Sequence, residues 1–189
     1  MSNILNIRGR LSFEHIFRPD GQEGQTPAFS ATILIPKDDP QIAKIKDTIK
    51  QVAEAKWKTR AEGILRTIYA RENLCLRDGD LKADSSATYA SYKGMMYVSA
   101  RNSQRPTVFD RNVSPLVEAD GVIYSGCYVN ARIEFWAQDN ANGKRVNGKL
   151  LGIQFVKDGE RFGGGAGAAK AEDFEVLGEE DGTEKNPWD

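Results

Sequence analysis

The sequence predicts a mainly β domain with one long helix, followed by an acidic C-terminal tail. Three observations support this prediction. Apolar and polar residues alternate in several segments, which is the period of a half-buried strand. In residues 38–63 the apolar residues instead recur every three or four positions, as on one face of a helix. The last nineteen residues contain eight acidic residues and one lysine, a formal charge of −7.

The first elements of the chain are two predicted strands. Residues 4–13 alternate between apolar and polar side chains, so they predict a strand with one buried face. Residues 28–35 are rich in β-branched side chains and predict a second strand. The segment 19–27 between them begins and ends with proline and contains two glycines, which favours a loop.

A helix is predicted after the second strand. Asp38 or Asp39 can cap its N-terminus, and Pro40 suits its first turn. Gly63 is a plausible end, although the residues after it could extend or restart the helix. The apolar stripe that would face the core consists of Ile42, Ile45, Ile49 and Val52.

The C-terminal half predicts strands again. Residues 94–101 form a third strand, and 105–110 a short extended piece that begins at a sheet edge because it contains Pro106. Residues 126–138 alternate most clearly of all. Asn142-Gly143 is a strong hairpin signal, and 149–157 returns as the partner strand.

A chain with these elements is typical of an elaborated OB-fold, a five-stranded antiparallel barrel, although a sandwich or an open sheet would show a similar pattern. We expect the barrel domain to occupy residues 1–162. Residues 163–171 form a glycine-rich linker, and 172–189 form a disordered acidic tail with too little apolar surface to fold alone. Phe174 and Trp188 are the tail's candidate contact residues.

The charge of the chain is divided unequally between body and tail. The 189 residues contain 26 basic and 27 acidic side chains, but residues 1–170 alone contain 25 basic and 19 acidic ones, a charge of +6. A basic body joined to an acidic tail suggests a nucleic-acid surface and an interaction segment that competes for it.

Several function classes are excluded or weakened by composition. No apolar run reaches the ~20 residues that span a bilayer, so no membrane partner is expected, and the N-terminus is not a secretory signal. Cys75 and Cys127 suggest free thiols in a reducing cytoplasm, with a single disulfide as the alternative. His15 is the only histidine, which excludes a Ser-His-Asp triad and a multi-histidine metal site. No cofactor is predicted.

Basic and aromatic residues share the polar faces of the predicted strands. Cationic side chains can follow the phosphates of single-stranded nucleic acid, and aromatic rings can stack on its bases. The alternative for each aromatic residue is that it covers a neighbouring element. The candidates for phosphates are Arg8, Arg10, Lys93, Arg101, Arg105, Arg111 and Arg132, and those for bases are Tyr92, Tyr97, Tyr128 and Trp136.

Two other functions are kept as alternatives. Asp78, Asp80 and Asp84 lie close in sequence and could hold a divalent metal, as in a nuclease, although an ordinary Asp-Gly turn is the simpler explanation. A protein that does not bind DNA, and acts only as an adaptor through its tail, would also explain the acidic C-terminus.

Three segments resemble a known phage family: LRDGD at 76–80, GCYVNARIEFWAQDN at 126–140, and LLGIQFVKDGERFGGG at 150–165. They are similar to the Enc34-type phage single-stranded DNA-binding proteins and, more distantly, to the T7-type ones. The resemblance implies an OB-fold that binds single-stranded DNA without sequence preference during phage replication or recombination, in the cytoplasm of the bacterial host. From its charge, the acidic tail is expected to compete with DNA for the basic body and, once released by DNA, to recruit replication or recombination proteins. Here Asp189 follows Trp188, whereas tails of this class often end on the aromatic residue. A homodimer is left open.

Overall fold

The described part of the chain is residues 2–21 and 23–162 of a computed structural model. The predicted linker 163–171 and tail 172–189, with Phe174 and Trp188, lie outside the described residues, so the domain boundary after residue 162 stays a prediction. None of the described helices is long and apolar enough to cross a membrane.

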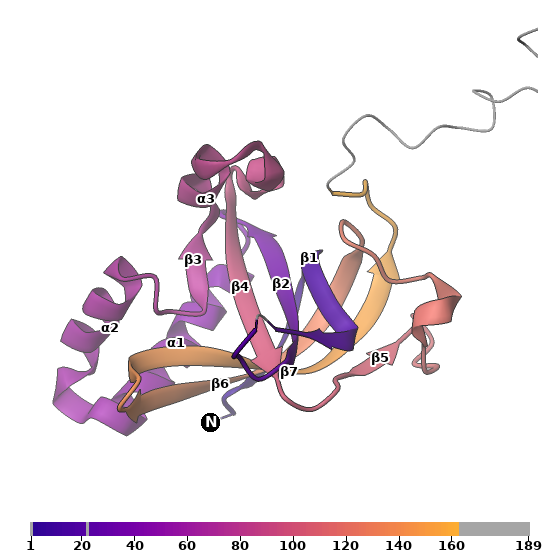
Figure 1. Ribbon diagram of the computed structural model, residues 1–189. Coiled ribbons are helices and arrows are strands. Elements are labelled where there is room, and N and C mark those ends of the chain that lie inside the picture. The colour runs from indigo at the N-terminus through magenta and orange to yellow at the C-terminus, as the bar shows by residue number, and fades with distance from the viewer. Residues whose placement is uncertain (1, 22, 163–189) are drawn as a thin grey trace, which may run out of the picture.

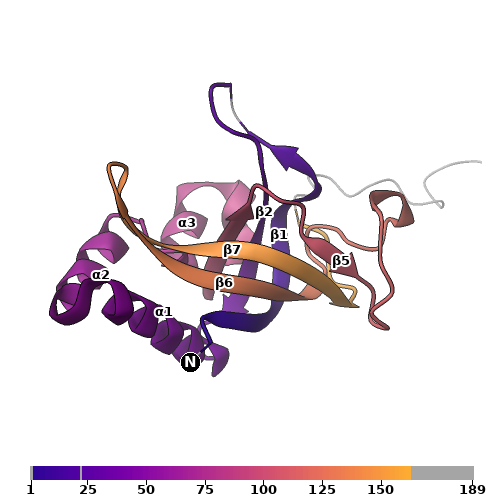
Figure 2. The ribbon, with the colours of Figure 1, turned by 90° about the horizontal axis from the view of Figure 1, so that it is seen from below.

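Five strands close into a barrel (Figures 1 and 2). β1 pairs with β2 and β6, β2 pairs with β4, and β6 pairs with β7, all antiparallel. β4 then pairs with β7 and completes the ring. The predicted OB-type barrel is therefore confirmed. The five strands are β1 (Ile4–Asp20), β2 (Ala28–Pro36), β4 (Met95–Asn102), β6 (Tyr128–Asn140) and β7 (Gly143–Lys157).

The closing pair corrects one part of the prediction, because the barrel is mixed and not wholly antiparallel. β4 and β7 run parallel, with Ala100 opposite Gly148 and Arg101 opposite Lys149. Strand directions cannot alternate around a ring with an odd number of members. A closed barrel of five strands must therefore contain at least one parallel pair, and here it joins β4 to β7.

Two short strands extend the barrel's edges. β3 (Leu76–Asp78) pairs antiparallel with β4, so the LRDGD segment begins as a strand and not as the predicted turn. β5 (Thr107–Phe109) pairs parallel with β7 and confirms the short extended piece expected after Pro106. A single turn of 3-10 helix, η3 (Glu118–Asp120), lies between β5 and β6.

The helix is longer than predicted and has a break. It consists of α1 (Gln41–Trp57), η1 (Lys58–Arg60) and α2 (Ala61–Ala70), and the backbone turns at Lys58, whose φ is +55°. Gly63 therefore lies inside α2 and does not end the helix. The predicted stripe is confirmed, with three of its residues fully buried and Val52 partly buried. α1 packs beside β6, and its Trp57 Nε1 donates to Asp139 Oδ2 at 2.9 Å (Figure 2).

Most buried residues form one core inside the barrel and under α1. Ile7, Ile33, Val98 and Ile133 from four different strands are at most 1% exposed. Cys75 and Cys127 are both buried and free, so the disulfide alternative is wrong, and burial raises the pKa of Cys75 to about 12. A second, smaller cluster lies outside the barrel, where α3 (Gly79–Ser85) and η2 (Ala87–Tyr92) cover β2 and β4 (Figure 1).

The close approach of β1 to β2 gives a test of the barrel packing. A Cβ at Gly9 would clash with the Leu34 carbonyl oxygen and lie 2.7 Å from Ile33 Cγ2. We expect Gly9→Ala to lower the free energy of unfolding by about 1–3 kcal/mol, measured by urea denaturation. Gly63→Ala is the matched control, because nothing lies within 4 Å of its Cβ in α2. It should be neutral or stabilise by up to ~1 kcal/mol. If Gly9→Ala left the free energy of unfolding unchanged, the close packing at Gly9 would be contradicted.

Candidate nucleic-acid interface

The predicted binding residues do not share one surface. The structure divides them into a buried group, a group on the outer face of β1, β6 and β7, and a group along a groove beside β2 and β4. Each group has a different capacity to bind nucleic acid, so they are considered in turn.

The buried group corrects the prediction for two tyrosines. Tyr92 is 0% exposed and Tyr97 is 3% exposed, and their rings pack edge to face at 5.2 Å. The Tyr92 hydroxyl donates to Ser12 Oγ at 3.2 Å, and burial raises the pKa of Tyr92 to about 12. Neither ring offers a face to a base, so the predicted stacking role of both is wrong. The alternative, that these aromatics cover a neighbouring element, is correct for them.

Lys93 belongs to the same region, although it is exposed. It follows η2, and its Nζ lies 3.1 Å from Asp84 Oδ1 on α3. The ammonium group therefore already has a carboxylate partner. A phosphate contact at Lys93 stays a prediction, and it would have to compete with that carboxylate.

The second group lies on what we call the cationic face, the outer surface of β1, β6 and β7. The strand register places Asn6 opposite Arg132, Arg8 opposite Asn130, and Arg10 opposite Tyr128. Each of these residues points out of the barrel, because the alternate positions form the core. The predicted residues on this face, with one added by the structure, are Arg8, Arg10, Tyr128, Arg132 and Lys157.

Tyr128 is flanked by two cations on the cationic face. The Arg10 guanidinium carbon lies 5.5 Å from its ring centre and the Lys157 Nζ lies 4.6 Å from it. Arg10 also lies 4.1 Å from the Phe162 ring, and its Nε donates to the Gly126 carbonyl at 3.2 Å. A base could stack on Tyr128 only by displacing a cation. This face is therefore better suited to phosphates than to bases.

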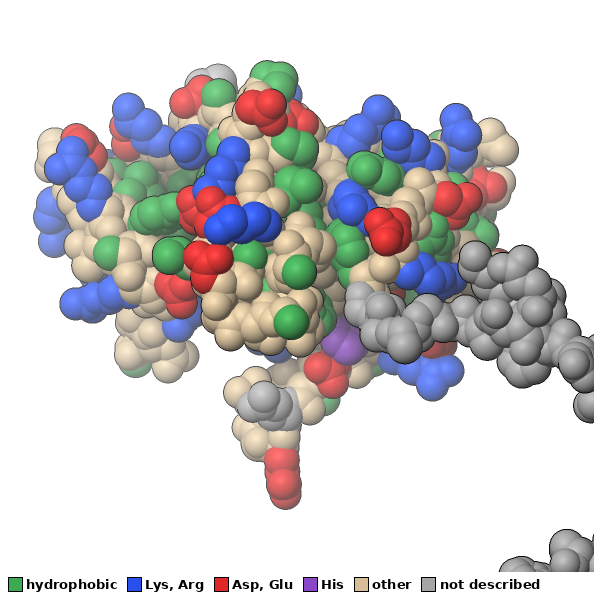
Figure 3. Space-filling model, turned by 90° about the horizontal axis from the view of Figure 1, so that it is seen from above, with side chains coloured by type: hydrophobic (Ala, Val, Ile, Leu, Met, Phe, Trp, Pro, Cys, Tyr) green, Lys and Arg blue, Asp and Glu red, His purple; other side chains and the backbone are tan. Residues whose placement is uncertain are grey.

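The third group lies along what we call the β2–β4 groove. It consists of two adjoining hollows of about 390 Å³ each, and Arg101 lines both of them. The first hollow contains Phe13, Ser30 and Thr32, and lies beside the β1–β2 hairpin. The second contains Trp136 on β6. The hairpin projects from the body in Figures 2 and 3 and forms one wall of the groove.

The parallel pair β4–β7, which closes the barrel, brings the charged residues of the second hollow together. Arg101 on β4 is opposite Lys149 on β7, which is in turn opposite Glu134 on β6. All three side chains line the second hollow together with Trp136, which is 42% exposed. Two cations next to an exposed indole are the combination that a single strand requires.

Sequence reasoning missed Phe13, which lines the first hollow. Its position in the alternation predicts a core residue, but it is 44% exposed. The β1–β2 register shifts between Ser12 and His15, and the φ of Phe13 is +48°, so a bulge turns the ring outward. The Phe13 ring lies 5.4 Å from the half-buried ring of Tyr89, which supports it from one side.

Two further predicted arginines lie near these surfaces. Arg105 lies two residues after Ser103, which lines the second hollow. Its guanidinium carbon lies 5.6 Å from the Phe17 ring, at the base of the hairpin. The backbone carbonyl of Arg111 accepts a hydrogen bond from Gln154 at the margin of the cationic face. In Figure 3 acidic side chains stand among the basic ones, so this side of the molecule is not uniformly positive.

The three aspartates of the nuclease alternative do not form a metal site. Lys37 Nζ lies 2.7 Å from Asp78 Oδ1 and 2.7 Å from Asp80 Oδ2, and Asp84 pairs with Lys93. Hydrogen bonds from Lys37 lower the pKa of both Asp78 and Asp80. Within residues 2–21 and 23–162 there is no cluster of three potential metal ligands. These carboxylates instead hold α3 against the strand that precedes α1.

The fold and the groove together define a class of protein. In OB-folds the outer face of the second and third strands and the adjoining loops bind oligonucleotides. Those strands are β2 and β4 here, and the loop between the first two strands is the hairpin beside the groove. The chain thus has the architecture of an OB-type nucleic-acid-binding barrel.

Comparison with known proteins identifies the family. Residues 2–185 match the family model of the single-stranded DNA-binding protein of Enterobacter phage Enc34. The chain belongs to this family of phage single-stranded DNA-binding proteins. It is 46% identical over 172 residues to putative protein p50 of Acyrthosiphon pisum secondary endosymbiont phage 1, covering 89% of this chain and 90% of that protein.

Solved structures agree with this assignment. The single-stranded DNA-binding protein from bacteriophage Enc34 in complex with single-stranded DNA is 31% identical, with a TM-score of 0.72, covering 85% of this chain and 90% of that one. The corresponding protein of bacteriophage T7 is 16% identical, with a TM-score of 0.58, covering 97% of this chain and 98% of that one, and this likeness shows the fold alone.

The Lys37 ion pairs predict a response to acid. The pKa values of Asp78 and Asp80 are lower in the folded chain than the ordinary value near 3.9. Between the lowered values and the ordinary one, the unfolded chain therefore binds more protons than the folded chain. Their contribution to stability is present above about pH 4 and is lost as the pH falls through the lowered values. We expect Asp80→Asn to lose less stability than the wild type between about pH 5 and pH 2, measured by urea denaturation.

Lys37→Gln removes the partner that Asp78 and Asp80 share. It should therefore reduce the dependence of the free energy of unfolding on pH over the same range. If Asp80→Asn kept the full acid dependence of the wild type, the ion pairs would not be the cause.

Proposed function

We propose that the chain binds single-stranded DNA without sequence preference in the β2–β4 groove. The observation that carries this proposal is that one cationic side chain, Arg101, lines both hollows. An exposed aromatic ring stands in each hollow, Phe13 in one and Trp136 in the other. Arg101 and Lys149, which lie opposite each other on neighbouring strands, supply positive charge to the second hollow.

The aromatic rings and the cationic side chains of the groove have different roles. Stacking on an aromatic ring contributes about 1–3 kcal/mol per base, and it tolerates any base because every base has a π-face. Arg101 and Lys149 would contact phosphates. If about five phosphates are neutralised in all, log affinity should fall with log salt at a slope near −3.5. The Enc34 relative that was solved with single-stranded DNA supports the choice of ligand.

The cationic face would continue the path of a longer strand. Arg132 precedes Glu134 of the groove by two residues on the outer side of β6, which is roughly 7 Å. A strand that leaves the groove near Trp136 can therefore reach Arg132 and then Arg8. On this face we propose phosphate contacts alone, since Tyr128 is already flanked by cations.

The tail is proposed to regulate this binding. Its charge of −7 complements the +6 of the body, and the glycine-rich linker gives it a high effective concentration near the basic surfaces. Bound DNA would release it, so that Phe174 and Trp188 could recruit replication or recombination proteins in the host cytoplasm. This role gives the acidic C-terminus a function that depends on DNA.

The groove and the cationic face can be separated by one pair of arginine variants. We expect Arg101→Ala to weaken binding to a short strand of about five nucleotides and to reduce its salt slope by about 0.7, the effect of one phosphate. Arg8→Ala is the matched control on the other face. It should leave the short strand unaffected and weaken only a longer one, measured by fluorescence anisotropy with oligo-dT. Equal losses for the short strand would contradict the assignment of the groove.

Deleting residues 171–189 should tighten binding to oligo-dT, because the competing anion is removed. The gain should be largest at low salt, where charges are least screened. The measurement is a titration of the full and shortened chains at two salt concentrations, with duplex DNA alongside. Unchanged or weaker affinity would contradict competition by the tail. No binding by either chain at low salt would favour the adaptor alternative.

A further inference from the structure

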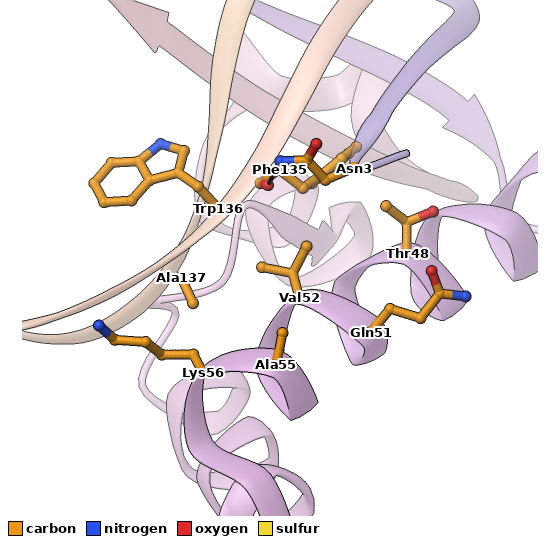
Figure 4. A pocket seen from close by; sticks show the side chains of 9 residues that line it. All are labelled: Asn3, Thr48, Gln51, Val52, Ala55, Lys56, Phe135, Trp136 and Ala137. Atoms are coloured by element: carbon orange, nitrogen blue, oxygen red, sulfur yellow. Dashed lines mark hydrogen bonds between the residues drawn. The ribbon is translucent and has the colours of Figure 1, made fainter. Parts of the chain in front are cut away.

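A second groove lies between α1 and β6, on the other side of Trp136. Figure 4 shows its lining side chains, which come from one side of α1 and from the facing part of β6. The groove has a volume of about 610 Å³, and its lining is mostly apolar. Val52 and Ala55 line it from the helix, and Trp136 and Ala137 from the strand. We call it the α1–β6 groove.

The groove is open because the facing side chains are small. The N-terminal part of α1 buries its stripe fully, with Ile45 and Ile49 at most 3% exposed. One turn later Val52 is only partly buried, and Ala55 is exposed opposite Ala137. An apolar hollow lined by alanines has room for larger apolar side chains from a ligand.

The charge around the groove indicates which ligand it would take. Residues 41–60, which form α1 and η1, carry six basic and two acidic side chains. Lys56 lines the groove directly, and its side chain lies at the rim in Figure 4. An apolar hollow with a lysine at its rim, beside a helix with excess positive charge, is complementary to an acidic peptide that presents a few large apolar side chains.

The chain itself contains such a segment. Glu172, Asp173 and Glu175 stand beside Phe174, and Val176-Leu177 follows. The last described residue, Phe162, is anchored near the start of β6 by a hydrogen bond from its amide to the Ser125 carbonyl. From there β6 covers about 26 Å between Tyr128 and Trp136. The twelve residues from Phe162 to Phe174 can span about 40 Å when extended, so the segment can reach the groove.

We propose that the α1–β6 groove binds residues 172–177 of the same chain, with Phe174 and Leu177 in the apolar hollow. This inference deepens the proposed regulation by the tail and rests on it. Trp136 lines both this groove and the second hollow of the β2–β4 groove. A base that stacks on Trp136 and the tail segment therefore use the same ring. DNA releases the tail by taking the indole, as well as by competing for the cations.

The affinity required of this site is low. A glycine-rich linker of this length is expected to give an effective concentration in the millimolar range, so a dissociation constant near 1 mM keeps the site about half occupied. Removing an occupant that is bound half of the time raises the apparent affinity for DNA about twofold.

The full-length chain can test the site by NMR, with one substitution on each partner. Ala55→Glu adds a carboxylate to the lining of the groove, where it repels the acidic segment. We expect it to shift the backbone amide signals of residues 172–177 and to raise the affinity for oligo-dT about twofold. Ala43→Glu is the matched control, because Ala43 is also exposed on α1 but does not line the groove. It should leave the tail signals unchanged.

The reciprocal variant replaces Phe174, Val176 and Leu177 by alanine. It should move the Trp136 indole signal and leave the signal of Trp57, whose indole is bound to Asp139. Adding oligo-dT to the wild type should move the tail signals to their Ala55→Glu positions. Identical tail signals in wild type and Ala55→Glu would overturn the proposal.

Two further outcomes separate the possible causes of failure. If unlabelled wild-type chain restored the Trp136 signal of the labelled tail variant, the occupant would come from a second copy, and binding within one chain would be wrong. If the wild type did not bind oligo-dT while the tail signals still responded to Ala55→Glu, the site would stand and the proposed DNA-binding function would fail.

Discussion

The parallel pairing of β4 with β7 is the constraint on which the rest of the site depends. Five strands cannot close a ring by antiparallel pairs alone, so one parallel junction is unavoidable, and the chain places it where Arg101 meets Lys149. Arg101 at that junction lines both hollows of the groove. The junction also brings Trp136, on the next strand but one, close enough to share the second hollow with Arg101. Barrel closure and the proposed binding path are thus consequences of the same pairing.

Local patterns predicted the strands and the helix well, because alternation and the helical period are set by neighbours in sequence. They could not show which outer face would be covered. Tyr97 has the alternation of an exposed residue, but α3 and η2 bury it. Phe13 has the alternation of a core residue, but a bulge turns it outward. Both errors arise from features that depend on distant packing or on one irregular backbone position, and neither leaves a periodic signal.

Asp78, Asp80 and Asp84 show that charges, too, depend on residues distant in sequence. Their spacing suggests a metal site, but Asp78 and Asp80 pair with Lys37, about forty positions earlier, and Asp84 pairs with Lys93. A lysine ammonium between two carboxylates satisfies the charge that a metal would otherwise supply, so this cluster contributes to structure. Arg8 and Arg132 were predicted correctly as outward-facing cations, since strand parity alone places them on the same face. What parity could not show is that Arg101 lines both hollows of the groove, whereas Arg8 and Arg132 line neither.

The position of Trp136 between two grooves has a thermodynamic consequence for the proposed regulation. Two ligands that compete for one ring weaken each other by the same factor, because coupling between binding sites is reciprocal. A replication protein that captured the tail segment would therefore strengthen DNA binding by the same factor by which bound DNA strengthens that protein's hold on the tail. Recruitment and tighter coating of DNA would then be a single equilibrium. No conformational change of the barrel is needed for this exchange, since Trp136 is already exposed and already lines both grooves.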